Sequence, residues 1–196
     1  MNLWTKIALL AAVQVGALLA MIADKQWTLN TGTAVVLTTI PVDPRSPLMG
    51  DYVRLDYTIS RLPLAGEDAV GGDKEFKRYD TVWVAIKADP AGAQAVSVHH
   101  QRSAIPPGLL ALQGEVRYLS EYNWDRGRNQ FGKNSPTLYV RYGIEQYYVQ
   151  EGSGNWIERP PGGEKVAVLA AIDTRGKAGI LALLLNGREY YRETLF

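Results

Sequence analysis

The sequence predicts a mostly β protein that begins with a single transmembrane helix, and three observations support this. Residues 7–23 form an uncharged apolar run, later segments are rich in β-branched side chains, and an Asn-Gly pair separates two of the last segments. Short β-branched segments divided by turn residues are typical of antiparallel sheets. We therefore expect a membrane anchor at residues 1–27 and one mainly antiparallel β domain at residues 28–196.

The apolar run reads IALLAAVQVGALLAMIA, with Gln14 as its one strongly polar residue. With its flanks it gives a helix of about 22 residues, enough to cross a hydrocarbon core of about 30 Å. Trp4 and Trp27 bracket it at the depth where indole rings favour the interface, so we expect residues 4–27 to contact lipid. Because no small-x-small cleavage site follows, an uncleaved anchor is favoured over a cleaved signal peptide or a buried core helix.

Charge at the two ends of the run predicts its orientation. Lys6 and the amino terminus make one flank positive, whereas the charges of Asp24 and Lys25 cancel at the other. Positive flanks stay in the cytoplasm. We therefore expect a cytoplasmic N-terminus and an exported domain, which in a bacterium means an inner-membrane protein with a periplasmic domain. The absence of Cys is compatible with that compartment.

The first part of the domain predicts strands separated by loops. A β-branched strand at 33–40 precedes the proline-rich residues 41–49, and strict alternation follows at 52–59. This alternation places Leu55 and Tyr57 on an apolar face and Arg54 on a polar face. Further strands are expected at 81–88, 95–101, 110–119 and 138–149, the last bent at Gly143, with loops at 61–77 and at 120–136, which carries Trp124 and Phe131.

The C-terminal residues give the clearest pattern. Strands are expected at 165–172, 177–185 and 188–194, with turns at 173–176 and at Asn186-Gly187. Asn-Gly favours a two-residue hairpin turn because both of its central residues need positive φ. The sequence therefore predicts a three-stranded antiparallel meander, and the continuous apolar run of its middle strand indicates that both faces of that strand are covered.

Residues 50–57 read Gly-Asp-Tyr-Val-Arg-Leu-Asp-Tyr and match the pattern G-D-Y-x-x-L-x-Y at every fixed position. The motif residues are Gly50, Asp51, Tyr52, Leu55 and Tyr57. A P-x-D-P-R segment precedes the motif, and a Tyr-Tyr-x-x-Glu-Gly stretch follows at 147–152. The chain thus resembles the GDYXXLXY proteins over most of its length, with residues 61–136 matching loosely. The resemblance implies a bacterial membrane-anchored protein of uncharacterised function, of a kind often encoded beside multi-spanning membrane proteins, and it supplies no catalytic residue.

Two interpretations of the motif remain open. In the structural one, Gly50 and Asp51 form a braced turn that leads into a strand, Arg45 pairs with Asp51 or Asp56, and Tyr57 is a core residue with a bonded hydroxyl. In the functional one, polar residues of the motif region contact a partner or ligand. The predicted binding residues are Asp43, Arg45, Asp51, Tyr52, Tyr147 and Glu151.

Composition excludes several classes of function. Lys and Arg number 21 against 20 Asp and Glu, so the net charge is +1 and no nucleic-acid partner is expected. Without Cys and with two His there is no thiolate nucleophile, and adjacent His99 and His100 are expected on opposite faces of a strand. No phosphate-loop or dinucleotide motif is present. We therefore expect no cofactor, no metal site and no enzyme activity.

The expected function is that of an accessory or scaffold subunit that binds a larger integral membrane protein. The alternative is a periplasmic binding module for a glycan or a small polar ligand. A cofactor-free hydrolase ranks last, because sequence does not show the separation of paired carboxylates that such chemistry needs. Its candidate carboxylates are Asp43, Asp51, Asp56, Glu145 and Glu151.

Overall fold

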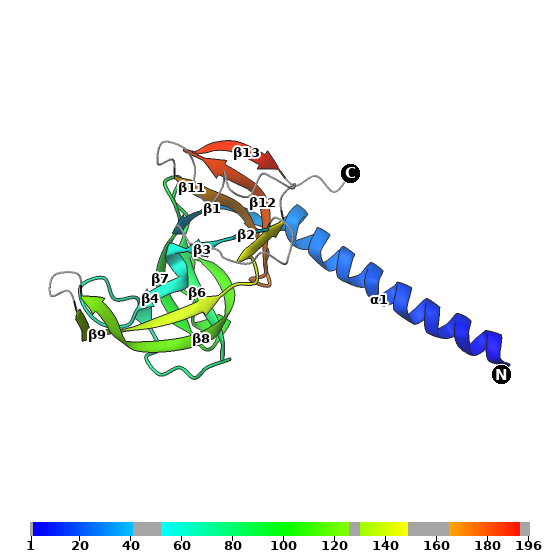
Figure 1. Cartoon of the computed structure of the whole chain (residues 1–196), viewed down its shortest axis with the longest axis horizontal. Coiled ribbons are helices and arrows are strands. Elements are labelled where there is room, and N and C mark those ends of the chain that lie inside the picture. Colours follow the sequence, from blue (N-terminus) through cyan, green and yellow to red (C-terminus); the bar gives the residue numbers. More distant parts are fainter. Residues whose placement is uncertain (1, 41–51, 126–129, 149–164, 193–196) are drawn as a thin grey trace.

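A computed structural model describes residues 2–40, 52–125, 130–148 and 165–192. It confirms the predicted fold class, since antiparallel sheets follow one long N-terminal helix (Figure 1). The proline-rich turn at 41–49 lies outside the described residues.

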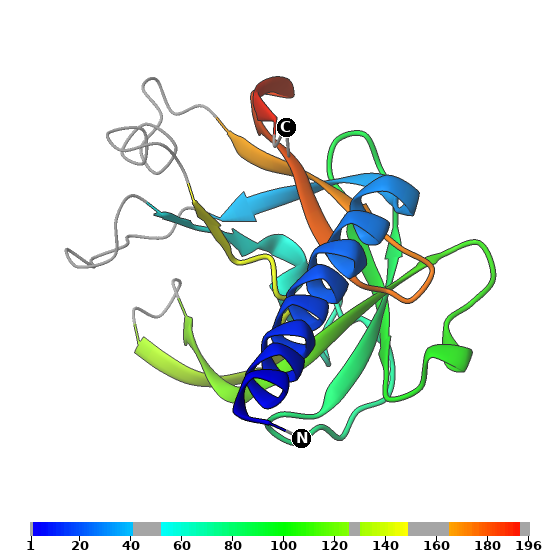
Figure 2. The same cartoon turned by 90° about the vertical axis from the view of Figure 1, so that its right-hand side faces the viewer.

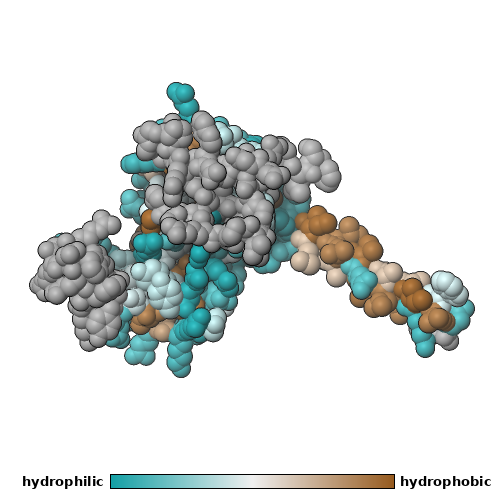
Figure 3. All heavy atoms as spheres, in the orientation of Figure 1, coloured by the Kyte–Doolittle hydropathy of each residue, from teal (hydrophilic) through white to brown (hydrophobic). Residues whose placement is uncertain are grey.

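Helix α1 (Leu3–Thr31) is long and apolar enough to cross a membrane, which fits a membrane anchor or a signal sequence. The Asn2 side chain caps it by accepting a hydrogen bond of 3.0 Å from the Thr5 amide. Its most apolar stretch is 0% buried in the chain, and Figure 3 shows this part as a hydrophobic rod standing clear of the domain. At 1.5 Å per residue the helix is about 44 Å long, more than a hydrocarbon core needs, so its last turns are available to pack on the domain.

The strands form two layers that face each other (Figure 1). In one layer the described strands run in the order β13 (Arg188–Arg192), β12 (Ala178–Leu185), β11 (Val166–Ile172), β1 (Thr33–Ile40) and β3 (Asp56–Tyr57). In the other they run in the order β4 (Arg61–Pro63), β9 (Gln130–Arg141), β8 (Leu110–Asp125), β6 (Thr81–Lys87), β7 (Gln94–His99) and β5 (Gly71–Gly72). Neighbouring strands pair antiparallel, apart from the short parallel contact of β5 with β7.

The hydrophobic core lies between the two layers. Leu37 and Val168 enter it from the first layer and Val84, Leu112 and Leu138 from the second, and each is 0% exposed. Each of these side chains belongs to a strand whose alternate residues face the interior. Short elements close one side of the core: β2 (Tyr52–Arg54) pairs with β10 (Gln146–Tyr148), and two single-turn helices, η1 (Thr58–Ser60) and η2 (Arg102–Ala104), lie between strands.

Three sequence predictions are wrong in detail. The strand expected at 52–59 is divided at Leu55, because β2 pairs with β10 whereas β3 pairs with β1, and η1 follows. The loop expected at 120–136 is instead largely strand, since β8 runs to Asp125 and β9 starts at Gln130 with Trp124 opposite Phe131. Polar composition suggested a loop, but the pairing of two consecutive strands decided the structure. The region predicted as a loop at 61–77 also contains the short strands β4 and β5.

The predicted turns are found where positive φ is required. Asn186 has φ 49° and Gly187 has φ 76°, as expected for an Asn-Gly hairpin turn between β12 and β13. Gly143 has φ 81° and separates β9 from β10, which confirms the predicted bend. This bend brings residues 142–147 against the motif strand and thereby shapes the cleft described next.

Candidate functional site

The described part of the motif strand is fixed to the bend that follows β9. Leu55 is 3% exposed, and its amide donates to the Glu145 carbonyl at 2.8 Å. The Tyr57 hydroxyl donates to the Ile144 carbonyl at 2.6 Å. In return, the Tyr142 hydroxyl donates to the Ile59 carbonyl at 2.6 Å. The predicted core role of Tyr57, with a bonded hydroxyl, is confirmed.

We call these contacts between the motif strand and the bend the motif brace. Its two tyrosines, Tyr57 and Tyr142, donate their hydrogen bonds in the protonated form. Burial raises the pKa of Tyr57 well above its ordinary value, and the negative charge of Glu145 raises it further. The same two causes, in the same order, raise the pKa of Tyr142. Because an ionised phenol could not donate to a carbonyl, the raised pKa of each tyrosine favours the protonated form that makes the hydrogen bond.

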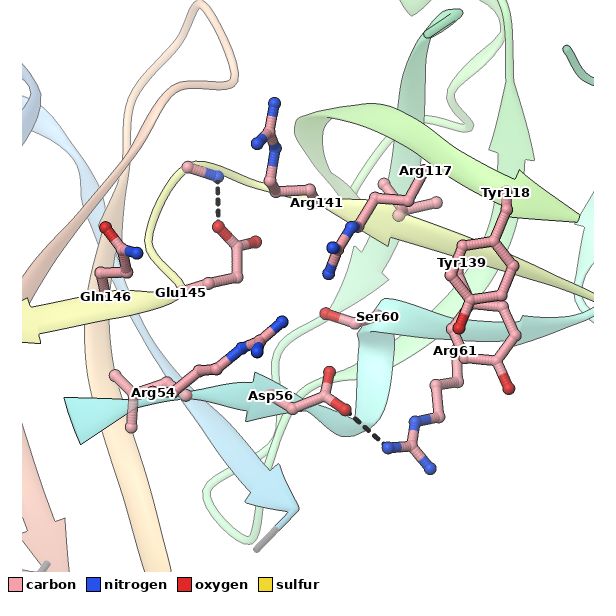
Figure 4. A pocket seen from close by; sticks show the side chains of 13 residues that line it. Arg54, Asp56, Ser60, Arg61, Arg117, Tyr118, Tyr139, Arg141, Glu145 and Gln146 are labelled. Carbon is pink, nitrogen blue, oxygen red and sulfur yellow. Dashed lines mark hydrogen bonds and ion pairs between the residues drawn. The ribbon is translucent and has the colours of Figure 1, made fainter. Parts of the chain in front are cut away.

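Beside this brace lies a polar cleft of about 590 Å³ between the motif strand and the β8–β9 pair (Figure 4). We call it the arginine cleft. Its lining residues are Arg54, Leu55, Asp56, Ser60, Arg61, Arg117, Tyr118, Tyr139, Val140, Arg141, Gly143, Glu145 and Gln146.

Several charged groups of the cleft are occupied by neighbours. Arg61 donates to Asp56 at 2.6 Å, and this hydrogen bond raises the pKa of the Arg61 guanidinium. Arg141 donates to Glu115 at 2.9 Å. The Glu145 carboxylate accepts hydrogen bonds from the backbone amides of Tyr142 and Gly143 at the bend. In Figure 4 the Arg61 and Arg141 guanidiniums point away from the centre of the cleft.

Arg54, Arg117 and Ser60 differ from these groups. Figure 4 shows the Arg54 guanidinium, from β2, and the Arg117 guanidinium, from β8, pointing toward the centre of the cleft with the Ser60 hydroxyl between them. Neither guanidinium makes an ion pair or a hydrogen bond with the residues that the structure describes. Ser60 is 5% exposed, and its hydroxyl has no partner within the described ranges.

Two stacked tyrosines form one wall of the arginine cleft. The rings of Tyr118 and Tyr139 lie 4.3 Å apart between centroids, with an interplanar angle of 18°. They project from paired positions of β8 and β9. Tyr118 is 48% exposed, and burial of part of its ring raises the pKa of its hydroxyl. The wall therefore offers an aromatic surface next to the arginines.

A second polar cluster joins α1 to the domain. We call it the helix–domain junction and define it by Asp24, Thr28, Asp173, Arg175 and Lys177. The Asp173 side chain is 0% exposed, accepts from the Thr28 hydroxyl at 2.9 Å and binds the Arg175 guanidinium at 2.6 Å. Asp24 pairs with both Arg175 and Lys177. Figure 2, which looks at the molecule from the side toward which α1 extends, shows the helix crossing in front of the strands.

Opposing effects act on the buried carboxylate of the junction. Burial raises the pKa of Asp173, but hydrogen bonds from Arg175, Thr28 and the backbone amides of Lys177 and Arg175 outweigh it, so the pKa lies below its ordinary value. Asp173 is therefore an anion surrounded by donors, and its charge is compensated where it is buried.

Most residues predicted to bind a ligand cannot be placed. Asp43, Arg45, Asp51 and Glu151 lie outside the described residues, and so does the motif residue Gly50. The backbone of Tyr52 belongs to β2, and nothing further is described of this residue. Tyr147 is 5% exposed and packs edge to face against Tyr191 with centroids 6.0 Å apart, so its ring belongs to the core.

The paired histidines differ from the expectation of opposite faces. His100 Nδ1 lies 2.8 Å from Asp73 and His99 Nδ1 lies 3.9 Å from the same carboxylate. Strand β7 ends at His99, so strand alternation no longer governs His100, whose ring stacks on Phe76. Hydrogen bonds from the backbone and side chain of His100 lower the pKa of Asp73. The two histidines therefore hold the loop that carries Asp73 against the end of β7.

Sequence analysis missed the convergence of Arg54, Ser60 and Arg117. Alternation placed Arg54 on the polar face of the motif strand, which is the one signal that pointed to this surface. Arg117 comes from a strand more than sixty residues later, and no local pattern relates the two. The junction was missed for the same reason, because Thr28 and Asp173 are 145 positions apart.

Fold and motif together define a class of protein with two features. A β domain directly follows an apolar N-terminal helix, and two motif residues, Leu55 and Tyr57, fix the motif strand to the rest of that domain. The model of the GDYXXLXY protein family matches residues 14–183, which include the second half of the apolar run and the whole motif. The chain belongs to the GDYXXLXY family. No curated protein and no solved structure matches it.

Proposed function

We propose that this protein is an accessory or scaffold subunit that binds a larger integral membrane protein. In this proposal α1 remains in the bacterial inner membrane with its N-terminus in the cytoplasm, and the β domain lies in the periplasm. The helix–domain junction is the observation that supports the proposal, because it fixes the orientation of the β domain relative to α1.

A simple membrane tether needs only an anchor and a flexible linker. Here Gly32 alone separates α1 from β1, and its amide donates to the Thr28 carbonyl at 3.0 Å. Asp173 and Arg175 bind the last turns of the helix, so the domain has a defined direction relative to α1. Such an arrangement suits a subunit that must present one face to a neighbour in the same membrane.

The surface of α1 is available for that neighbour. Its large apolar side chains are exposed from Leu3 to Ile22, and an added Cβ at Gly16 would meet nothing within 4 Å. In a bilayer these side chains meet either lipid or the helices of another protein. We propose that part of this surface contacts the partner, while the junction directs the domain toward it.

Co-purification in a mild detergent tests the partner. The chain, tagged at its C-terminus and expressed at its natural level, is expected to elute with one multi-spanning protein in fixed ratio by native mass spectrometry. Recovery as a lone chain in every detergent would contradict the proposal.

A linker insertion tests whether orientation matters. The sequence Gly-Ser-Gly-Ser inserted between Thr31 and Gly32, together with Asp24→Ala and Thr28→Ala, keeps the apolar run and removes the contacts by which the junction sets the direction. We expect the variant to stay in the membrane fraction and to lose the partner. The same insertion after Glu67, in an exposed loop, is the matched control and is expected to retain it. Full recovery of the partner by the Thr31 variant would show that orientation is irrelevant.

Labelling of single cysteines tests the topology, because the natural sequence contains no Cys. With the outer membrane permeabilised, an impermeant maleimide is expected to label Asp68→Cys in the domain and not Asn2→Cys before α1. Labelling of Asn2→Cys alone would reverse the proposed orientation.

A further inference from the structure

We propose that the arginine cleft binds the phosphate group of a phosphate monoester, with Arg54, Arg117 and Ser60 as the binding residues. This site is independent of the partner proposed above. Three features of the cleft lead to it, taken in turn.

The first feature is uncompensated charge. Among the described lining residues four arginines accompany two carboxylates, Asp56 and Glu145. Asp56 is bound by Arg61, and Glu145 is bound by backbone amides at the bend. Arg54 and Arg117 keep their charges without a partner in the described chain, although both point toward the same space (Figure 4). Two like charges that converge repel each other, and a bound anion removes that repulsion.

The second feature is a buried donor at the same place. Ser60 is 5% exposed and its hydroxyl has no hydrogen-bond partner in the part of the chain that is described. Buried hydroxyls are normally satisfied, so an unpaired one that faces a cleft requires an explanation. In Figure 4 it lies between the Arg54 and Arg117 guanidiniums, and because its oxygen is itself buried, an oxyanion bound by both meets Ser60 once the surrounding side chains shift to admit it.

The third feature is the arrangement of the donors. Arg54 comes from β2, Ser60 from η1 and Arg117 from β8, so they approach the site from three elements. A tetrahedral phosphate presents three oxygens in different directions, whereas a carboxylate presents two in one plane. A phosphate monoester also carries about −1.5 to −2 charge at neutral pH, which matches two guanidiniums.

The stacked tyrosines indicate the rest of the ligand. Tyr118 lies beside the arginines and is 48% exposed. Aromatic rings of this kind accept the apolar face of another ring while their hydroxyls bind polar groups. The ester that best fits is therefore one whose phosphate is attached to a polar ring such as a sugar.

The same phosphate chemistry has two possible sources, a soluble ester and a lipid headgroup. At 1.5 Å per residue, Thr28 lies about 8 Å beyond the end of the apolar run at Ala23. The domain is thus held close to headgroups as well as to the aqueous phase.

Binding to the purified full chain in detergent tests the proposal with glucose 6-phosphate as the probe and glucose as its uncharged counterpart, at constant ionic strength. Calorimetry is expected to show saturable binding of glucose 6-phosphate and no binding of glucose. In parallel, the chain in nanodiscs of phosphatidylcholine with phosphatidic acid is compared with the chain in phosphatidylcholine alone, by its melting temperature. Response to glucose 6-phosphate identifies a soluble ester as the source, and response to phosphatidic acid alone identifies a lipid.

Substitutions then assign the site. Arg54→Gln and Arg117→Gln are each expected to weaken binding about tenfold, because each removes charged hydrogen bonds. Ser60→Ala is expected to weaken binding several-fold without lowering the melting temperature, which a merely structural serine would not do. Arg188→Gln on β13 changes the net charge equally at an exposed site and is expected to bind as the natural chain does.

Two results would overturn the proposal. One is the absence of any response to glucose 6-phosphate and to phosphatidic acid. The other is a loss of binding in Arg188→Gln equal to that in Arg54→Gln and Arg117→Gln, which would show general attraction to positive charge. Neither result bears on the proposed partner, whose test uses neither ligand.

Discussion

At the helix–domain junction the Asp173 side chain is 0% exposed and is held by Thr28, Arg175 and backbone amides, whereas in the arginine cleft Arg54 and Arg117 have no partner among the described residues. Both regions are rich in charge and both join elements that are distant in sequence. In the junction the charges are compensated and therefore hold the helix to the domain. In the cleft the described residues leave Arg54 and Arg117 uncompensated, which is why we assign these two side chains to a ligand.

The largest expected effect comes from removing the buried carboxylate of the junction. Asp173→Ala leaves the amides of Arg175 and Lys177 without an acceptor, and the Thr28 hydroxyl keeps only its longer hydrogen bond of 3.3 Å to the Asp24 carbonyl. We expect a loss of about 2–3 kcal/mol in the free energy of unfolding, or about 5–10 °C in melting temperature for a chain of this size. Thermal unfolding of the full chain in detergent measures it. Asp68→Ala, in an exposed loop, is the control, and equal melting of the two variants would contradict a structural role for the junction.

Truncation separates the apolar, exposed part of α1 from the last turns that pack on the domain. We expect residues 28–196 to be soluble and folded but less stable, by roughly 1–2 kcal/mol, than residues 24–196, which keep the helical turns packed on the domain. Both fragments keep Leu29, which packs beside Gly179, but only the longer fragment keeps Asp24 and its pairs with Arg175 and Lys177. Chemical denaturation of both fragments measures the difference. Insoluble material from both would instead place the apolar run in the core.

The motif brace is expected to give a smaller effect than the junction. Tyr57→Phe removes the hydroxyl that donates to the Ile144 carbonyl and leaves a buried acceptor unpaired. We expect a loss of about 1.5 kcal/mol, measured as a shift of the denaturation midpoint. Tyr190→Phe, at a ring that is 49% exposed, should change little. Equal shifts in the two variants would mean that the Tyr57 hydroxyl does not stabilise the bend.

The sequence predicts some of these structural features and not others. Strict alternation identified Leu55 and Tyr57 as core residues, and the Asn-Gly pair identified the last hairpin, because both signals depend on neighbouring residues. The β8–β9 pairing beyond Ser120 was predicted as a loop because its polar composition with Gly and Asn is typical of loops, although partners such as Trp124 and Phe131 are close in sequence. The cleft and the junction were missed for a different reason, because each is created by contacts across more than fifty residues.

Acid is expected to weaken the junction specifically. Hydrogen bonds hold the folded pKa of Asp173 below its ordinary value despite burial. Stability from this group is therefore fully present above the unfolded pKa of about 3.9 and is lost as the pH falls through the lower folded value. Between pH 7 and pH 3, the natural chain should lose more stability than Asp173→Asn, measured by denaturation at each pH. Parallel pH profiles would show that Asp173 titrates normally.

The smallest expected effect on stability comes from the arginines of the cleft, in contrast to Arg175 of the junction. Without ligand, Arg54→Gln and Arg117→Gln are expected to change the free energy of unfolding by less than about 0.5 kcal/mol, or to raise it slightly, because each variant removes a charge that repels the other arginine. Arg175→Gln, which removes the partner of Asp173 and Asp24, should lower the melting temperature clearly. Differential scanning calorimetry of the three variants side by side measures this. A fall in Arg117→Gln as large as that in Arg175→Gln would mean that the cleft arginines stabilise the fold, and the distinction between the two regions would not stand.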